Sequence, residues 1–194
     1  MKTNREALLL IAFRLFLQRG YAHTSMRDLV NASGLSKGAF HHYFPRKQDL
    51  LDACIEHFFS RFLPDIDPSV HQHFDELVLD CAGQYAQLLN ELGQLDIPLH
   101  AYQRFVWSIL PEHGTVFAER QHQMEDRLTQ LAEQDLIQQR LRSSADASTL
   151  AIQAMALIEG LGVLRAASPE SASPDPRHEL RSICEAWLNG LFGR

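Results

Sequence analysis

The sequence is poor in the features that mark secreted and membrane proteins. Its 194 residues contain three cysteines, an odd number without paired spacing, so we expect reduced thiols and no disulfide framework. The N-terminus lacks the charged start, apolar middle and cleavage site of a signal peptide. By our interpretation the most apolar stretch is residues 7–17, which contains Arg14 and is far shorter than the ~20 residues of a membrane span. We therefore expect a cytoplasmic protein without a membrane partner.

The sequence also lacks the motifs of common enzyme classes. We find no glycine-rich phosphate loop after a strand, no Gly-x-Ser-x-Gly elbow and no pair of acids at catalytic spacing. The histidines His71, His73, His100, His113 and His122 have no second Cys, His or Asp at the spacing of a zinc site. We expect no catalytic residue, no metal and no cofactor.

The charge is unevenly distributed along the chain. Lys and Arg total 18 against 24 Asp and Glu, which gives a net charge of -6 and argues against a nucleic-acid partner for the chain as a whole. The first fifty residues, however, contain eight basic and three acidic residues, whereas the remainder contains ten basic and twenty-one acidic residues. The N-terminal segment alone has the charge that phosphate groups attract.

Apolar residues recur with the period of an amphipathic helix in every long segment, and no segment alternates for long enough to require a strand. The sequence predicts an all-α protein of about nine helices. They span residues 4–19, 25–32, 36–43, 47–62, 70–92, 98–110, 115–142, 147–166 and 177–192. Because the charge changes sign near the end of the fourth helix, we expect an N-terminal domain at residues 1–63 and a C-terminal domain at residues 64–194.

The second and third predicted helices have the proportions of a helix-turn-helix spanning about residues 25–44. Ser25 and Asp28 have the spacing of a capping box that begins the second helix. Gly34 occupies the turn, where a left-handed conformation costs glycine little. Ser36 is the predicted N-cap of the third helix. This third helix would be the one that enters the major groove.

The polar and small residues of this segment are therefore candidates for DNA contacts. Small residues near the start of the third helix permit close approach to bases, and lysine and hydroxyl groups can contact guanine or phosphate. The candidates are Thr24, Ser25, Arg27, Ser36, Lys37, Gly38, Ala39, His41, His42, Tyr43 and Lys47.

Residues 20–51 resemble the DNA-binding domain of TetR-family transcriptional regulators. The resemblance rests on the Gly-Leu-Ser-Lys-Gly run at 34–38, the His-Tyr-Phe run at 42–44 and the following Lys47. It implies a homodimer that binds a palindromic operator through its N-terminal domain, with a C-terminal domain for effector binding and dimerisation. Two residues depart from the family pattern. His41 replaces the usual Tyr, and Arg46 replaces a Ser or Asn that commonly caps the fourth helix.

The last two helices are the candidates for the dimer contact. The final helix carries one continuous apolar stripe, and the helix at 147–166 is apolar around most of its circumference, so we expect burial on two sides. From the residues alone, packing of the final helix into its own core is somewhat favoured; the resemblance favours a four-helix bundle between two chains. The interface residues would be Leu157, Leu161, Leu164, Leu180, Ile183, Cys184, Trp187, Leu188 and Leu191.

A small hydrophobic or aromatic effector is the second partner that the resemblance implies. Its candidate contacts are Phe58, Phe62, Tyr85, Tyr102, Phe105, Trp107, Phe117, Met124, Met155 and Glu159. Each of these is also consistent with an ordinary core position, because periodicity does not separate a packed core from a cavity. The sequence thus predicts a ligand-released repressor. The alternative is a DNA-binding regulator controlled by a partner protein or by oxidation of a cysteine such as Cys54 or Cys81.

Overall fold

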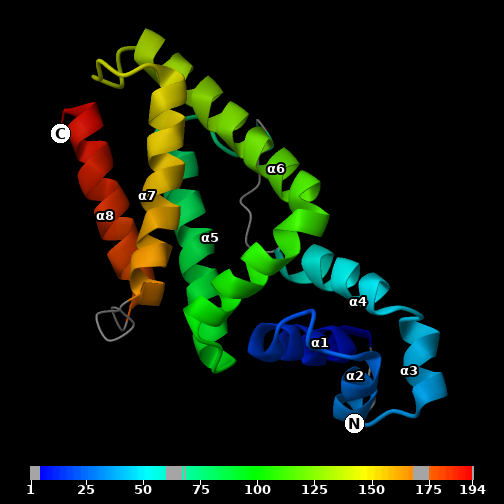
Figure 1. The fold of residues 1–194 in the computed structure, drawn as a ribbon. Coiled ribbons are helices and arrows are strands. Elements are labelled where there is room, and N and C mark those ends of the chain that lie inside the picture. The colour runs from blue at the N-terminus through cyan, green and yellow to red at the C-terminus, as the bar shows by residue number, and fades with distance from the viewer. Residues whose placement is uncertain (1–4, 60–66, 68, 168–174, 194) are drawn as a thin grey trace. The chain divides into compact units, whose positions relative to one another are not determined.

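A computed structural model describes residues 5–59, 67, 69–167 and 175–193; the side chains of residues 58–59 and 112–117 lie outside this description. Within the described residues the chain is entirely helical, which confirms the all-α prediction (Figure 1). The elements are α1 (Arg5–Arg19), α2 (Met26–Ser33), α3 (Lys37–Tyr43), α4 (Lys47–Cys54), the π-helical η1 (Ile55–Phe59), α5 (Phe74–Gln94), α6 (Leu99–Ile137), α7 (Ala147–Ala167) and α8 (Pro176–Phe192).

The chain divides into two compact units. Unit 1 comprises Met1–Phe62 together with Asp96–Glu112, and unit 2 comprises Leu63–Leu95 together with His113–Arg194. The expected division into residues 1–63 and 64–194 does not anticipate that Asp96–Glu112, including the first part of α6, belongs with the N-terminal helices. Helical periodicity marks this segment as apolar on one face but does not identify the helices that it contacts.

Aromatic side chains join α6 to the N-terminal helices in the core of unit 1. Phe105 of α6 is buried; its ring lies edge-on to Phe13 at 6.0 Å and is stacked on Phe16 at 6.2 Å between centroids. Helix α1 packs against both α2 and α4. This arrangement positions α2 and α3, which contact one another, at the surface of unit 1.

Helices α5, α7 and α8 lie side by side in unit 2 (Figure 1). Their core includes residues from each of the three helices, such as Leu77, Ala154 and Cys184. The contact between α5 and α7 is close at Gly162, where an added Cβ atom would collide with the hydroxyl group of Tyr85. A larger residue at 162 would force Tyr85 to move.

One prediction about α6 is wrong. The predicted break between helices at 98–110 and 115–142 is absent: α6 runs without a break from Leu99 to Ile137 with Pro111 inside it. A proline removes one backbone donor and costs about 3 kcal/mol in a helix interior. The carbonyl group deprived of that donor belongs to Trp107, a residue that is 70% exposed.

Residues 7–17 are also not the most apolar stretch of the chain. Helix α7 is long and apolar enough, by length and composition alone, to cross a membrane. The same properties occur in core helices of proteins that remain in water. One face of α7, including Leu150, Ala154 and Ile158, packs into the core of unit 2.

Candidate nucleic-acid interface

Helix α2 begins with the capping box that the sequence predicts. The backbone N–H of Asp28 donates to Ser25 Oγ at 3.2 Å, and the backbone N–H of Ser25 donates to Asp28 Oδ2 at 2.9 Å. These hydrogen bonds lower the pKa of Asp28 below its usual value. The capping box therefore satisfies two of the donors that a helix N-terminus leaves unpaired.

The turn between α2 and α3 depends on Gly34, which adopts φ 68° and ψ 5°. This left-handed conformation is unfavourable for residues with a Cβ atom. The hydroxyl group of Ser33 donates to the carbonyl of Val30 at 2.7 Å and accepts from the N–H of Leu35 at 3.1 Å. The backbone thus changes direction between the two helices without leaving these groups unpaired.

Helix α3 presents an apolar face to unit 1 and a polar face to water. Ser36 caps its N-terminus by accepting from the N–H of Ala39 at 3.2 Å, as predicted. Phe40 and Phe44 are buried and anchor the helix. The opposite face exposes Lys37, Gly38, Ala39, His42 and Tyr43, while His41 is half-buried. These six candidates therefore lie together on one short helix.

Gly38 is not required by the packing of its own chain. No atom lies within 4 Å of the place where a Cβ atom would be added, and its φ is not in the left-handed region. The space above this part of α3 is open, which is the property that close approach of another molecule needs.

Ser25 and Arg27 are exposed beside the start of α2, but Thr24 is not. Thr24 is only 1% exposed, and its hydroxyl group donates to the carbonyl of Gly20 at 2.9 Å. Its backbone N–H donates to the carbonyl of Tyr21 at 3.2 Å. The prediction that Thr24 contacts DNA is therefore corrected, because its hydroxyl and its N–H both serve the turn between α1 and α2.

Lys47 makes two contacts with Tyr21 inside unit 1. Its ammonium group donates to the carbonyl of Tyr21 at 2.9 Å and lies 4.0 Å from the centre of the Tyr21 ring. The Tyr21 hydroxyl in turn donates to Gln48 at 2.9 Å. These contacts hold the charge of Lys47 at the start of α4 and give Lys47 a structural role as well.

The two departures from the family pattern also have internal partners. His41 Nδ1 lies 3.2 Å from the carbonyl oxygen of Pro45, so this nitrogen is placed to donate to it. The Arg46 guanidinium pairs with Asp49, whose pKa it lowers. Asp49 also accepts from the backbone N–H of Arg46 at 3.1 Å, which supplies part of the cap that the Arg46 side chain cannot.

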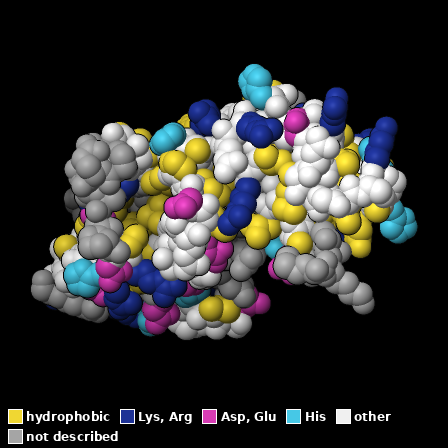
Figure 2. Space-filling model, turned by 90° about the horizontal axis from the view of Figure 1, so that it is seen from below, with side chains coloured by type: hydrophobic (Ala, Val, Ile, Leu, Met, Phe, Trp, Pro, Cys, Tyr) yellow, Lys and Arg dark blue, Asp and Glu magenta, His cyan; other side chains and the backbone are white. Residues whose placement is uncertain are grey.

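The surface charge agrees with the uneven distribution in the sequence. Figure 2 shows one face of the molecule, and on its right half Lys, Arg and His side chains are more frequent than Asp and Glu. In α2 and α3 the exposed charged side chains include Arg27 and Lys37. A polyanion approaching these helices meets mostly positive charge.

The candidate effector residues are not brought together. Phe62 and the side chains of Phe58 and Phe117 lie outside the described residues. Phe105 belongs to the unit 1 core, Tyr102 is half-buried in unit 1, and Trp107 is exposed. In unit 2, Met124 is buried, Tyr85 and Met155 are half-buried, and Glu159 is exposed. Periodicity could not assign Phe105 and Trp107 to a different unit from Met124.

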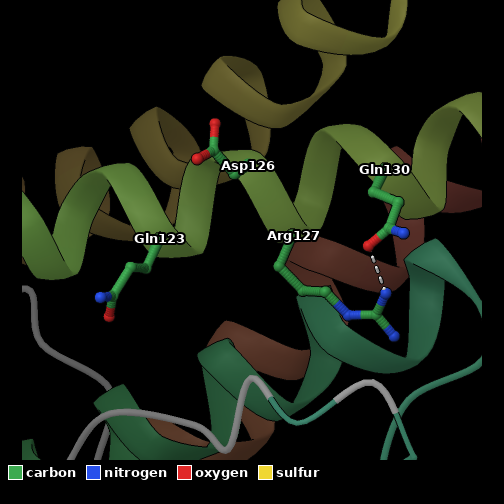
Figure 3. Close-up of a pocket in the computed structure, with 4 residues that line it drawn as sticks. All are labelled: Gln123, Asp126, Arg127 and Gln130. Atoms are coloured by element: carbon green, nitrogen blue, oxygen red, sulfur yellow. Dashed lines mark hydrogen bonds between the residues drawn. The ribbon is translucent and has the colours of Figure 1, made fainter.

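A shallow pocket of about 440 Å³ opens on α6 instead (Figure 3). Its described lining consists of Gln123, Asp126, Arg127 and Gln130, and Arg127 donates to Gln130 Oε1 at 2.7 Å. None of these four was among the candidates. Their polar head groups differ from the aromatic and aliphatic side chains that we expected around an effector.

Three of the candidate dimer residues pack into the core of their own chain. Leu180, Cys184 and Leu188 are buried in the core of unit 2, so they are not available to a second copy. Leu157, Leu161, Ile183, Trp187 and Leu191 are half-buried, and Leu164 is 64% exposed. The apolar stripe of α8 packs against α5 of the same chain, with which α8 makes extensive contact.

The exposed apolar face of α7 was only partly anticipated. Ile152 and Val163 are more than half exposed, as is Leu164. Ile152 and Val163 are separated by eleven residues, about three helical turns, and therefore lie on the same side of the helix. The expectation that α7 is buried on two sides fails within one chain, because one side packs in the core and the other side is uncovered. The sequence feature that indicated this second apolar face is the presence of apolar residues around most of the circumference of the helix.

Comparisons with known proteins agree with this geometry. The family model described as bacterial regulatory proteins, tetR family, matches residues 8–54. The chain is 34% identical over 61 residues to the uncharacterized HTH-type transcriptional regulator YuxN of Bacillus subtilis (31% of this chain, 21% of YuxN). It is 25% identical over 167 residues to the HTH-type transcriptional repressor ComR of Escherichia coli (82% of this chain, 78% of ComR).

A solved structure shares the fold along nearly the whole chain. NalD, the secondary repressor of the MexAB-OprM multidrug efflux pump in Pseudomonas aeruginosa, superimposes with a TM-score of 0.70 at 22% identity. The match covers 97% of this chain and 96% of NalD. At this identity the likeness establishes the fold.

Proposed function

Because the chain belongs to the TetR family of transcriptional regulators, whose known members are not enzymes, we propose that it is a DNA-binding repressor that acts in the cytoplasm. The observation that carries this proposal is the exposed face of α3. Lys37, Gly38 and Ala39 are uncovered at the start of a helix that Phe40 and Phe44 fix to unit 1. A helix that is anchored on one side and small and basic on the other suits entry into the major groove.

The proposed contacts are of two kinds: contacts to base edges, which depend on the DNA sequence, and contacts to phosphates, which do not. Lys37 and Ala39 face base edges, where lysine donates to guanine and the alanine methyl group contacts a thymine methyl. Arg27 contacts phosphates beside the start of α2, and Lys47 does so from α4. The hydroxyl and backbone N–H of Ser25 are engaged by Asp28 in the capping box. Phosphate contacts supply affinity without sequence information, so specificity depends on α3.

Two copies of the chain bind the operator together in this proposal. We assign the contact between them chiefly to the uncovered face of α7 with Ile152, Val163 and Leu164, and to the half-buried edge of α8. An apolar face of this kind marks a protein-protein contact more often than a lone exposed leucine does. A two-fold dimer places its recognition helices on half-sites one helical turn or a multiple apart, which requires an operator close to a palindrome.

A small apolar effector releases the repressor from DNA in the same proposal. Within unit 2, burial raises the pKa of the Tyr85 phenol of α5, and the negative charge of Glu159 of α7 raises it further. Met155 lies one turn before Glu159. These residues are the part of the candidate set that an effector could contact together. Control by a partner protein is the alternative, and a panel of small hydrophobic compounds that leaves operator binding unchanged would favour it.

Selection of bound duplexes from random-sequence DNA tests the proposal. A repressor of this kind enriches one inverted repeat, and the purified protein binds the enriched duplex with two chains per site. If no sequence is enriched while the protein remains folded and dimeric, the proposed function is rejected.

A further inference from the structure

One ring nitrogen of His41 is already used within its own chain. Nδ1 lies 3.2 Å from the carbonyl oxygen of Pro45. A carbonyl oxygen only accepts hydrogen bonds, so Nδ1 must carry a hydrogen atom and donate it. The contact therefore fixes the tautomer of the neutral ring, in which Nδ1 is the donor and Nε2 carries a lone pair.

The polar face of α3 has room for another molecule beside His41. His41 is half-buried and lies one helical turn after the exposed Lys37, so the two residues are on the same side of the helix. Gly38, three residues before His41, has no atom within 4 Å of the place where a Cβ atom would be added. Among the described residues Nε2 has no hydrogen-bond partner, since the contact of His41 with Pro45 is made by Nδ1.

The position of His41 along α3 favours a phosphate as the partner of Nε2. In a helix-turn-helix the N-terminal residues of the recognition helix contact base edges. Lys37 begins α3, whereas His41 is the fifth of its seven residues. Since most hydrogen bonds between proteins and DNA go to the backbone, a residue late in the helix is expected to contact a phosphate.

The neutral ring of His41 cannot donate to a phosphate from Nε2. A phosphate oxygen and the lone pair of Nε2 are both acceptors, and moving the hydrogen atom from Nδ1 to Nε2 would break the bond to Pro45. A protonated ring donates from both nitrogens. Its positive charge also strengthens the hydrogen bond to the phosphate.

The acids near α3 are paired with arginines. Asp28 of α2, the helix that packs against α3, lies 3.7 Å from Arg19, and Asp49 of α4 pairs with Arg46. Within the described residues neither acid forms an ion pair with His41. The other ionisable side chains of α2, α3 and the first turn of α4 are Arg27, Lys37, His42, Tyr43 and Lys47, and Arg5 of α1 lies over the ring of Phe44. A protonated His41 therefore gains an anionic partner when DNA binds.

We propose that His41 takes up one proton when the protein binds its operator, so that Nε2–H donates to a DNA phosphate while Nδ1–H stays bonded to Pro45. The proton comes from the solvent, and no covalent bond to a heavy atom forms or breaks. This inference rests on the proposed function, because it requires α3 to lie on DNA. The complex holds the proton more tightly than the free protein does, so operator affinity increases as pH falls from about 8 to about 6.

Fluorescence anisotropy on the selected duplex, at several pH values and constant ionic strength, measures this linkage. Wild-type affinity should rise by about tenfold for each bound chain if the phosphate favours the protonated ring by one pKa unit. His41→Gln carries an amide that does not titrate and can donate at any pH, so its affinity should stay constant over this range. A flat wild-type profile, or equal pH dependence in His41→Gln, overturns the proposal.

His42→Gln is the matched control. His42 is the next residue on α3 and is exposed, and its ring lies edge-on to Tyr43 at 6.0 Å between centroids. This variant should keep the pH dependence of the wild type, and its loss in His42→Gln alone would place the proton on the wrong residue. Failure of the proposed function gives a different result, because the protein would then select no duplex at any pH.

Nitrogen NMR of the wild-type protein with labelled histidines tests the tautomer directly, with His41→Gln used to assign the signals. The neutral His41 ring of the free protein should carry its hydrogen atom on Nδ1. Addition of the operator duplex should produce a ring with hydrogen atoms on both nitrogens. If Nε2 stays unprotonated in the complex, His41 does not donate to a phosphate and the proposal is wrong.

Discussion

Replacing Gly38 should change the stability of α3 and its affinity for DNA in opposite directions, so the two properties can be tested separately. The position is open within the chain and has helical backbone geometry, so the Cβ atom added by Gly38→Ala or Gly38→Leu creates no internal collision. Alanine is about 1 kcal/mol more favourable than glycine in a helix interior. We therefore expect Gly38→Ala to leave the Tm unchanged or to raise it.

The effect on DNA binding should have the opposite sign. If α3 packs closely against the major groove at Gly38, the added carbons overfill that contact, as extra methylene groups do in a packed core, at a cost of roughly 1–3 kcal/mol. This corresponds to about 5- to 150-fold weaker binding. Gly38→Leu should lie at or beyond the upper end of that range.

Fluorescence anisotropy on the selected operator duplex measures this loss. Gly83→Leu is the matched control, because Gly83 is also an open helical glycine but lies on α5 of unit 2. The control should bind the operator like the wild type. Unchanged affinity in a folded Gly38→Leu variant would refute close approach of α3 to the duplex.

Three further predictions concern charge, capping and assembly. Lys47→Ala, which removes a proposed phosphate contact, should weaken binding nearly independently of sequence and reduce the slope of log affinity against log salt by about one, as anisotropy at several salt concentrations would show; an unchanged slope would remove Lys47 from the contact. Because Ser25 lowers the pKa of Asp28, the ionised carboxylate stabilises the fold above its ordinary pKa and this contribution is lost as pH falls through the lowered value. Asp28→Ala should therefore lower the Tm at neutral pH, and its difference from the wild type should shrink below about pH 4; a constant difference contradicts the capping role. Val163→Glu should yield folded monomers in sedimentation, whereas Ile137→Glu, at another exposed apolar position, should leave the dimer intact; equal effects would argue against the α7 face.

The capping and turn residues of the helix-turn-helix could be predicted from the sequence. Ser25 with Asp28, Gly34 and Ser36 act through partners only a few residues away, and all take the predicted positions. Such contacts depend on the backbone nearby, so residue type and spacing are sufficient to predict them. Thr24 was the exception, since its hydroxyl was taken by the carbonyl of Gly20.

The partners in long-range contacts between helices could not be predicted from the sequence. The apolar stripe on α8 predicts burial but does not distinguish α5 of the same chain from a second chain, and Leu180 and Leu188 pack internally. Similarly, Phe105 was expected near an effector but packs on Phe13 and Phe16, more than eighty residues earlier. The periodicity of a helix identifies its apolar face, whereas the partner depends on the tertiary arrangement.

The position of α3 on the operator is tested most directly by photocross-linking. Ala39→Cys places an exposed thiol on the outward face of α3, whereas Cys54 and Cys184 are buried and Cys81 is partly buried. With an azidophenacyl group attached at residue 39, we predict cross-links to bases within both half-sites of the selected duplex, and none from the same group at Gly83→Cys. Cross-links from residue 83 but not from residue 39 would contradict the proposed docking of this protein on DNA.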